Sequence, residues 1–231
     1  MAHRRKTNTT KLEIIQIASR LFLNRGYSKT TIKAIADELD ISTGHLMFYF
    51  PTKEHLLAAL VHMLCDFQWK MVQNHVEEGN TSLMALCLEL STMAAMCEDD
   101  EIAKDLYLSA YTHPLTLEII RKNDTERAKL VFAEYCPHWN HQHFAEAEAL
   151  VSGIEYATLM TTGESLPMDI RISGGLNCIM MIYHVPEETR HIKISKVLVM
   201  DHHALGKRVL EDFKQYVEET TEQAFEDLLH S

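Results

Sequence analysis

Residues 30–53 read TTIKAIADELDISTGHLMFYFPTK, and this stretch predicts two short helices joined by a tight turn. Its first half repeats apolar side chains at i, i+3, i+4 and i+7, which is one face of a helix. Thr30 or Thr31 can cap the start of that helix, because a threonine hydroxyl accepts from free backbone N–H groups. Asp40 tolerates the left-handed backbone that a turn at residues 40–42 needs. The apolar residues of this face are Ile32, Ile35, Ala36 and Leu39.

The second helix is predicted to begin at Ser42 or Thr43 and to end before Pro51, because proline disfavours helix at the residue before it. Leu46 and Phe50 supply its buried side. Its outward side carries hydroxyl, imidazole and thioether groups and no negative charge, which suits the major groove of DNA. The outward residues are Thr43, His45, Met47 and Tyr49.

A third amphipathic helix precedes these two. Residues 12–27, LEIIQIASRLFLNRGY, carry an apolar face and a glycine, Gly26, suited to the position just after a helix. The pattern I-A-x-x-x-x-I-S-x-G-x-L-x-x-Y-F-x-x-K-E-x-L then covers residues 35–56. With these motifs in this order, residues 11–57 resemble the TetR family of bacterial transcriptional repressors.

The resemblance implies an all-α fold with two domains. Residues 1–53 would be the helix-turn-helix DNA-binding domain, and residues 54–231 a larger helical domain for effector binding and dimerisation. The chain would then be a homodimeric transcriptional regulator of the repressor class that binds a near-palindromic double-stranded DNA operator and leaves it when a small molecule binds. Two residues depart from the family pattern: Asp40 replaces the usual glycine, and Met47 replaces a phosphate-contacting tyrosine.

The DNA contacts are predicted from this alignment of motifs. Without a tyrosine at Met47, Tyr49 becomes the expected hydroxyl donor, and the absence of a side chain at Gly44 allows the helix to approach DNA closely. Basic side chains and the helix starts would bind phosphates, which set affinity and register. The predicted DNA-binding residues are Arg4, Arg5, Lys6, Thr31, Ser42, Thr43, Gly44, His45, Tyr49 and Lys53.

Charge is distributed unevenly along the chain. Residues 1–53 hold nine Lys/Arg and four Asp/Glu, a net charge of +5. The remaining residues carry a net charge of −16, which gives the whole chain its net charge of −11. A basic module on an acidic body indicates that a polyanion binds at one end only. Charge alone is explained equally well by solvated helix surfaces, so the motif decides between the two interpretations.

Composition argues against membrane, secreted and enzymatic classes. The longest uncharged run, residues 172–186, is too short to cross a bilayer, and the polar first residues do not form a signal peptide. Five scattered cysteines without a C-x-x-C pair favour reduced thiols in the cytoplasm. No G-x-S-x-G, phosphate-binding loop or H-E-x-x-H supports catalysis, and no cofactor is expected.

Helices alone are predicted after Lys53, with residues 192–200 the only stretch that also fits a strand. The first of them directly follows the recognition unit, so as a rigid rod it can carry a shift between the domains. The resemblance implies that an effector tilts it. The expected helices are 54–78, 82–97, 100–112, 115–135, 141–162, 168–184 and 187–229, the last interrupted near residues 204–206.

Two segments are predicted to form the dimer interface, with burial inside one subunit as the alternative. Residues 141–162 place small side chains at four-residue intervals, which lets another helix approach closely. Residues 168–184 are almost uncharged all round, as expected of a helix with little exposed surface. The apolar positions named in the second segment are Leu176, Ile179, Met180 and Tyr183.

Methionine and aromatic residues after Lys53 point to an apolar or aromatic effector, because methionine adapts to varied ligands. A cluster of imidazoles instead raises the alternative of a metal-responsive regulator, although its spacing fits no known zinc pattern. A further alternative is a DNA-bound interaction protein without a ligand. The candidate effector residues are Phe67, Met71, Met93, Tyr107 and Tyr111, and the candidate metal ligands are His138, His141 and His143.

Overall fold

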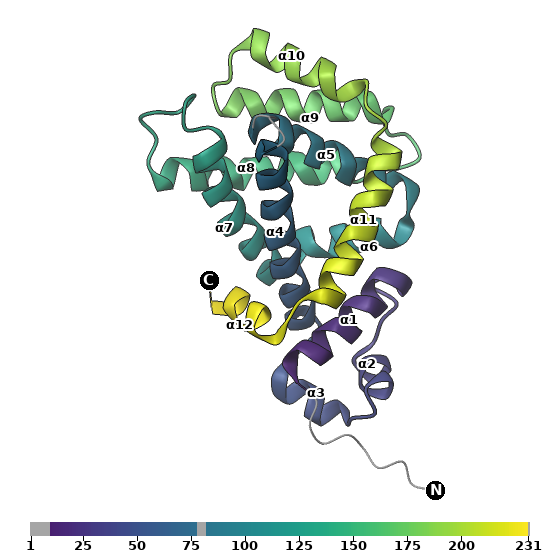
Figure 1. Ribbon diagram of the computed structural model, residues 1–231. Coiled ribbons are helices and arrows are strands. Elements are labelled where there is room, and N and C mark those ends of the chain that lie inside the picture. The colour runs from purple at the N-terminus through teal and green to yellow at the C-terminus, as the bar shows by residue number, and fades with distance from the viewer. Residues whose placement is uncertain (1–9, 78–81, 231) are drawn as a thin grey trace, which may run out of the picture.

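The computed structural model describes residues 10–77 and 82–230, and within these ranges the protein is built from helices without a strand (Figure 1). The all-α prediction is therefore confirmed. The helices are α1 (Lys11–Arg25), α2 (Ile32–Glu38), α3 (Thr43–Tyr49), α4 (Lys53–Glu77), α5 (Ser82–Asp99), α6 (Glu101–Thr112), α7 (Pro114–Val131), α8 (His141–Leu159), α9 (Met168–Ile182), α10 (Glu187–Leu198), α11 (His202–Glu219) and α12 (Glu222–His230).

Helices α1 to α3 form one end of the molecule, and the caps that define them are those expected from the sequence. The Thr31 hydroxyl accepts from the Ala34 N–H at 3.1 Å, and the Ser42 hydroxyl accepts from the His45 N–H at 3.1 Å. Asp40 has the left-handed backbone of the turn, with a φ of 55°, and Gly26 after α1 has a φ of 90°. The helix-turn-helix thus follows from local sequence alone.

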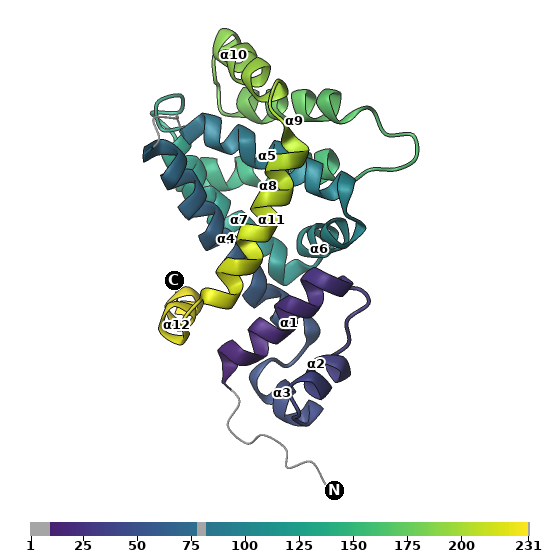
Figure 2. The ribbon, with the colours of Figure 1, turned by 45° about the vertical axis from the view of Figure 1, so that its right-hand side comes forward.

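Helix α4 joins this end to the rest of the molecule and lies between α7 and α11 in Figure 1, while Figure 2 shows α11 crossing the front of the body. Its N-terminal half packs on α1, and its length packs on α5 and α7. Lys53 is its first residue. The division of the chain into domains after Lys53 stays a prediction.

The segment predicted as a helix over residues 187–229 with a break near residues 204–206 is instead three helices, and its breaks lie elsewhere. The chain bends at residues 199–201, where the Asp201 carboxylate accepts from the Ala204 N–H at 3.0 Å and starts α11, and again at residues 220–221. Gly206 lies inside α11 rather than at a break. A Cβ there would lie 3.0 Å from the Thr92 carbonyl oxygen, so this glycine serves the close packing of α11 on α5.

One continuous hydrophobic core extends from the helix-turn-helix into the larger body. Four cysteines, at 65, 87, 97 and 136, are buried in it, and burial raises their pKa values, whereas Cys178 is exposed. Across residues 10–77 and 82–230, none of the helices combines the length and apolar character that a membrane span requires.

Candidate DNA-binding surface and effector cavity

The outer face of α3 is open to solvent. Leu46 is fully buried and Phe50 nearly so, and these two side chains fix the rotation of the helix. Thr43 and Gly44 are exposed as a result, while His45 and Tyr49 are half-buried, their rings in edge contact with centroids 5.5 Å apart. These four residues are therefore at least partly accessible to solvent, and their contacts with DNA stay a prediction.

Phe48 is a surface residue that sequence reasoning missed. Its side chain is 80% exposed beside Met47 at 48%, and its ring meets Tyr49 edge-on at 5.3 Å. The sequence analysis assigned Phe48 to neither side of the helix, although the helical period decides its position. Phe48 follows the buried Leu46 by two residues, about 200° around the helix, so it must point outward. An exposed aromatic ring of this kind can contact a thymine methyl group in the major groove.

Lys53 has a structural role besides its predicted phosphate contact. Its ammonium donates to the Tyr27 carbonyl at 3.0 Å and to the Thr30 carbonyl at 3.1 Å, and it lies 4.0 Å from the centre of the Tyr27 ring. Burial lowers the pKa of Lys53, partly offset by the negative Asp105. The first residue of α4 thereby holds the loop between α1 and α2. Arg4, Arg5 and Lys6 lie outside the described residues.

Two acidic side chains connect the helix-turn-helix end with the larger body. Asp105 of α6 accepts from both the backbone N–H, at 2.8 Å, and the hydroxyl of Ser28. Glu54 of α4 accepts from the Leu115 N–H at 3.1 Å, so it caps the start of α7. Asp105 therefore joins α6 to the loop after α1, and Glu54 joins the first turn of α4 to the start of α7.

A third connection lies at the other side of α1. The Gln16 amide donates to carbonyls at the end of α11, those of Val217 at 3.2 Å, Glu218 at 3.1 Å and Thr220 at 3.4 Å. These carbonyls lack partners within their own helix. The C-terminal end of α11 is thus bonded to α1 through the Gln16 amide, which supplies the hydrogen-bond donor that these carbonyls need.

The five predicted effector residues all border small cavities in the larger body. Phe67, Met71, Met93 and Tyr107 line one void, and Met93, Tyr107 and Tyr111 line a second. A third void adjoins Met93 on the side of α8. Each measures about 20 Å³, room for one water molecule. Met93 and Glu89 border all three voids.

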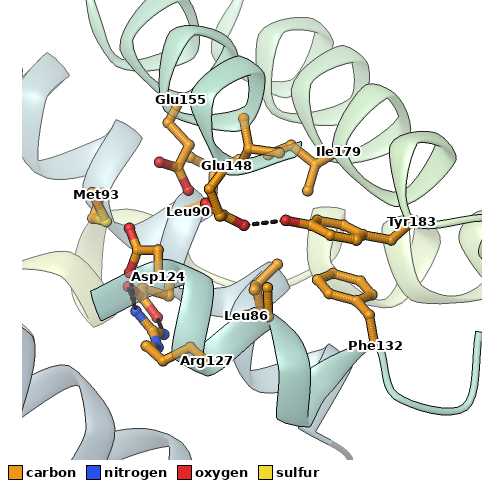
Figure 3. A pocket seen from close by; sticks show the side chains of 13 residues that line it. Leu86, Leu90, Met93, Asp124, Arg127, Phe132, Glu148, Glu155, Ile179 and Tyr183 are labelled. Carbon is orange, nitrogen blue, oxygen red and sulfur yellow. Dashed lines mark hydrogen bonds and ion pairs between the residues drawn. The ribbon is translucent and has the colours of Figure 1, made fainter. Parts of the chain in front are cut away.

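Charged residues line these voids, which the sequence reasoning did not anticipate (Figure 3). Arg127 of α7 is 5% exposed and pairs with Glu89 of α5 and, at 3.3 Å, with Asp124. From α8, Glu148 accepts from the Tyr183 hydroxyl, and Glu155 accepts from the Tyr111 hydroxyl at 3.0 Å. Glu148 and Glu155 stand seven residues apart, a spacing that puts both on one helix face and could have revealed them.

Burial changes the protonation of these carboxyl groups. It raises the pKa of Asp124 to about 6 and that of Glu148 to about 8. Burial also raises the pKa of Glu155 well above its ordinary range, and the negative Asp124 and Glu148 nearby add to the shift. Removing a carboxylate from water disfavours its charged form, and like charges close by do the same. Near neutral pH these shifts favour the protonated form of Glu148 and Glu155.

An apolar face on α8 and α9 points away from the rest of the subunit. Leu150 is 64% exposed and Met181 53%, and a Cβ added at Gly153 or Gly174 would meet nothing within 4 Å. The apolar residues named from the sequence, Leu176, Ile179, Met180 and Tyr183, are instead buried inside the subunit, as the alternative interpretation had it.

The candidate metal ligands have other partners or none. His143 closes a capping box with Asn140 at the start of α8, His141 lies 3.4 Å from Glu126, and His138 is exposed. In the described part of the chain, no three His, Cys, Asp or Glu side chains are arranged to hold a metal ion.

Comparison with known proteins places the first helices in one family. The sequence model described as "Bacterial regulatory proteins, tetR family" matches residues 14–60. The uncharacterized HTH-type transcriptional regulator YuxN of Bacillus subtilis is 32% identical over 80 residues, 35% of this chain and 28% of that protein. The HTH-type transcriptional regulator HbdR of Aromatoleum sp. is 28% identical over 110 residues, 48% of this chain and 47% of that protein. The matched segments thus span less than half the length of these curated relatives.

Solved structures overlap more of the chain at lower similarity. A gamma-butyrolactone receptor (ArpA-like protein) covers 86% of this chain and 95% of its own, with 19% identity and a TM-score of 0.44. AmtR of Mycobacterium smegmatis covers 91% of this chain and 97% of its own, with 20% identity and a TM-score of 0.34. Overlaps of this degree leave the ligand of the present protein open.

Proposed function

The chain belongs to the TetR family of bacterial regulatory proteins through its N-terminal helices, and on that premise we propose that it is a homodimeric transcriptional repressor released from its operator by a small molecule. The observation that carries the proposal is the exposed outer face of α3, presented by a capped helix-turn-helix whose core side is fully buried. A helix held in this way enters the major groove with its first residues against the bases.

Within that surface, base contacts and phosphate contacts fall to different residues. Thr43, His45 and Tyr49 contact the bases, and Phe48 adds an apolar contact. Gly44 has no side chain, so the start of the helix can approach the DNA closely. The phosphates are bound by basic side chains and by groups at the helix starts, independently of sequence. These phosphate-binding residues are Arg4, Arg5, Lys6, Thr31, Ser42 and Lys53.

The dimer forms through the outer face of α8 and α9. Leu150, Ile170 and Met181 supply exposed apolar area, and the open space at Gly153 and Gly174 lets a second pair of helices approach closely. A two-fold axis through this face pairs the two α3 helices, so the operator is a near-palindrome.

The effector binds in the voids around Met93 and acts through α6 and α7. These helices supply Tyr107, Tyr111 and Asp124 to the cavity walls. The same two helices contact the DNA-binding end, α6 through Asp105 on Ser28 and α7 through its start on Glu54. A ligand that enlarges the cavity displaces both contacts and moves the two α3 helices of a dimer out of register with the groove. It acts only by its difference in affinity between the two forms.

Footprinting on the DNA that flanks the coding region tests the proposal. We expect a protected near-palindrome with half-sites about 34–36 Å apart, one turn of the duplex. The double variant Thr43→Ala/Tyr49→Ala should lose this protection, whereas His191→Ala, at an exposed position of α10 far from α3, should retain it. Protection that survives the double variant would overturn the assignment of α3.

A further inference from the structure

A groove between α4 and α7 is much larger than the voids around Met93. Its volume is about 570 Å³, against about 20 Å³ for each void, and it is partly open to solvent. Small-molecule sites typically have volumes of roughly 300–1,000 Å³. The groove shares only Cys65 with the walls of those voids, and none of the five predicted effector residues borders it. It is therefore a separate space with room for an organic molecule.

One face of each helix forms the walls of the groove. From α4 come His62, Cys65, Asp66 and Trp69, which stand at i, i+3, i+4 and i+7 and so share one face. The facing side of α7 is lined at the same helical spacing between residues 115 and 126. Helix α12 packs on α4 and adds Leu228 to the wall (Figure 1).

Two polar cross-links between α4 and α7 set the width of the groove. At its start, the Glu54 carboxylate accepts from the Leu115 N–H at 3.1 Å. Further along, the Trp69 indole N–H donates to the Asn123 side-chain oxygen at 2.9 Å. The second bond also fixes the orientation of the indole, which is half-buried in the wall. A ligand therefore meets a space and an aromatic surface that are already formed, which lowers the cost of ordering them on binding.

The acidic groups at the rim of the groove are already paired with cations. Asp66 lies 2.6 Å from the Lys70 ammonium, and Glu126 lies 2.7 Å from the Lys129 ammonium. Neither Lys70 nor Lys129 lines the groove, so both carboxylates are bonded from outside it. These two carboxylates consequently have little charge left to offer a ligand.

His62 is the half-buried polar side chain that a ligand can satisfy. Across residues 10–77 and 82–230, its imidazole has no hydrogen-bond or ion-pair partner. Burial lowers the pKa of His62, and the positive Lys122 lowers it further, so the ring is neutral at neutral pH. A neutral imidazole offers one donor and one acceptor. Glu118 stands one turn before Lys122 on α7 and balances its charge.

We propose that this groove binds a neutral aromatic compound with a hydroxyl or carbonyl oxygen, which lies along Trp69 and Ile119 and hydrogen-bonds to His62. The site goes beyond the proposed function, which places the effector around Met93. Flat aromatic bodies pack well on a fixed indole ring and on aliphatic side chains. A charged ligand of either sign would lose its hydration without gaining an unpaired counter-charge, which burial disfavours.

Three probes with one biphenyl body and different charge test the ligand class. The full chain is titrated at about pH 7.5 with 4-phenylphenol, 4-phenylbenzoate and 4-phenylbenzylammonium, and binding is measured by calorimetry. We expect the neutral phenol to bind at least tenfold more tightly than either charged probe, about 1.4 kcal/mol. Equal or tighter binding of a charged probe, or binding of none of the three, would overturn the proposal.

Substitutions then locate the bound phenol. Ile119→Trp places an indole in the open space and should weaken binding at least tenfold. Leu130→Trp is the matched control on the same helix, because Leu130 is 67% exposed and lies outside the groove, and it should bind normally.

The hydrogen bond is tested separately. His62→Leu keeps an apolar side chain of similar size and should weaken the phenol while leaving the unfolding temperature nearly unchanged. His191→Leu, at an exposed position of α10, is its control. The readout is binding by the chain alone, so it does not depend on operator DNA or on the voids around Met93. Unchanged affinity in both Ile119→Trp and His62→Leu would place the phenol elsewhere and refute the site.

Discussion

The two ends of this molecule use charged and aromatic residues in opposite ways. At the DNA-binding end, Phe48 stands exposed and Lys53 bonds to backbone carbonyls near the surface. In the larger body, Tyr183 and Glu148 are buried beside a small void. The first arrangement is ready for a ligand that arrives as a surface, whereas the second must open before a ligand can enter. We therefore propose that one chain combines an exposed DNA-binding surface with a buried effector cavity, and five experiments test that contrast.

The largest expected effect is the salt dependence of DNA binding. If several phosphates are neutralised per subunit, raising the salt from 50 to 200 mM should weaken operator binding by roughly 10³- to 10⁵-fold, because bound counterions are released from the duplex. Fluorescence anisotropy with a labelled operator measures this slope. An operator affinity that stays constant over this range of salt would contradict phosphate binding by the basic side chains of residues 1–53.

Loss of the dimer should be the next largest effect. Leu150→Asp puts a charge into the proposed interface, so we expect a monomer by sedimentation and operator affinity reduced on the order of 100-fold. Leu130→Asp is the control, since Leu130 on α7 is equally exposed, at 67% against 64%. If the two variants behave alike, the face on α8 and α9 is not the interface.

Communication between the two ends should depend on Asp105. Effector release by 100-fold corresponds to a coupling free energy of about 2.7 kcal/mol, and Asp105→Ala should reduce it to a few-fold because α6 then loses its hold on Ser28. Glu101→Ala, on the same helix with its side chain 86% exposed, should leave the coupling intact. The ratio of operator affinities with and without an effector found by a thermal-shift screen provides the measurement. Undiminished release in Asp105→Ala would exclude this route.

Sequence preference should separate Phe48 from Lys53. Phe48→Ala should weaken the best operator by roughly 1–3 kcal/mol at one base pair and relax the choice there, as expected of a lost base contact. Lys53→Ala should weaken all sequences about equally, and it should also lower thermal stability because the Tyr27 and Thr30 carbonyls lose a donor. Selection from a randomised operator library compares the two. A changed preferred sequence in Lys53→Ala would reverse the roles.

The smallest expected effect is the dependence of the free energy of unfolding on pH. Glu148 has its pKa raised from 4.5 to about 8, so the folded state holds a proton that the unfolded state has released. This contribution is complete below about pH 4.5 and is lost as the pH rises to 8, at roughly 1 kcal/mol per pH unit, and Asp124 adds to the decline up to about pH 6. Urea unfolding of Glu148→Gln should show a shallower decline between pH 6 and 8. A slope identical to that of the unaltered protein would mean that Glu148 is not protonated.

The sequence by itself determined the helix-turn-helix, its caps and its turn. Thr31, Ser42 and Asp40 act on backbone groups three residues away or less, and Leu46 with Phe50 fixes which side of α3 is buried, so local chemistry was sufficient. Most of the later helix boundaries followed from the same caps and breaks. The predicted effector residues also border the voids, although sequence could not specify which side of each helix faces them.

Only the tertiary structure decided the chemistry inside the body and the direction of its faces. Glu89, Arg127 and Glu155 come from three helices, and their pairing and their pKa shifts depend on burial that no local pattern encodes. Gly206 illustrates the same limit: it predicts a break by type, yet it serves the approach of α11 to α5. Local interactions select secondary structure, whereas desolvation and close packing depend on neighbours distant in sequence.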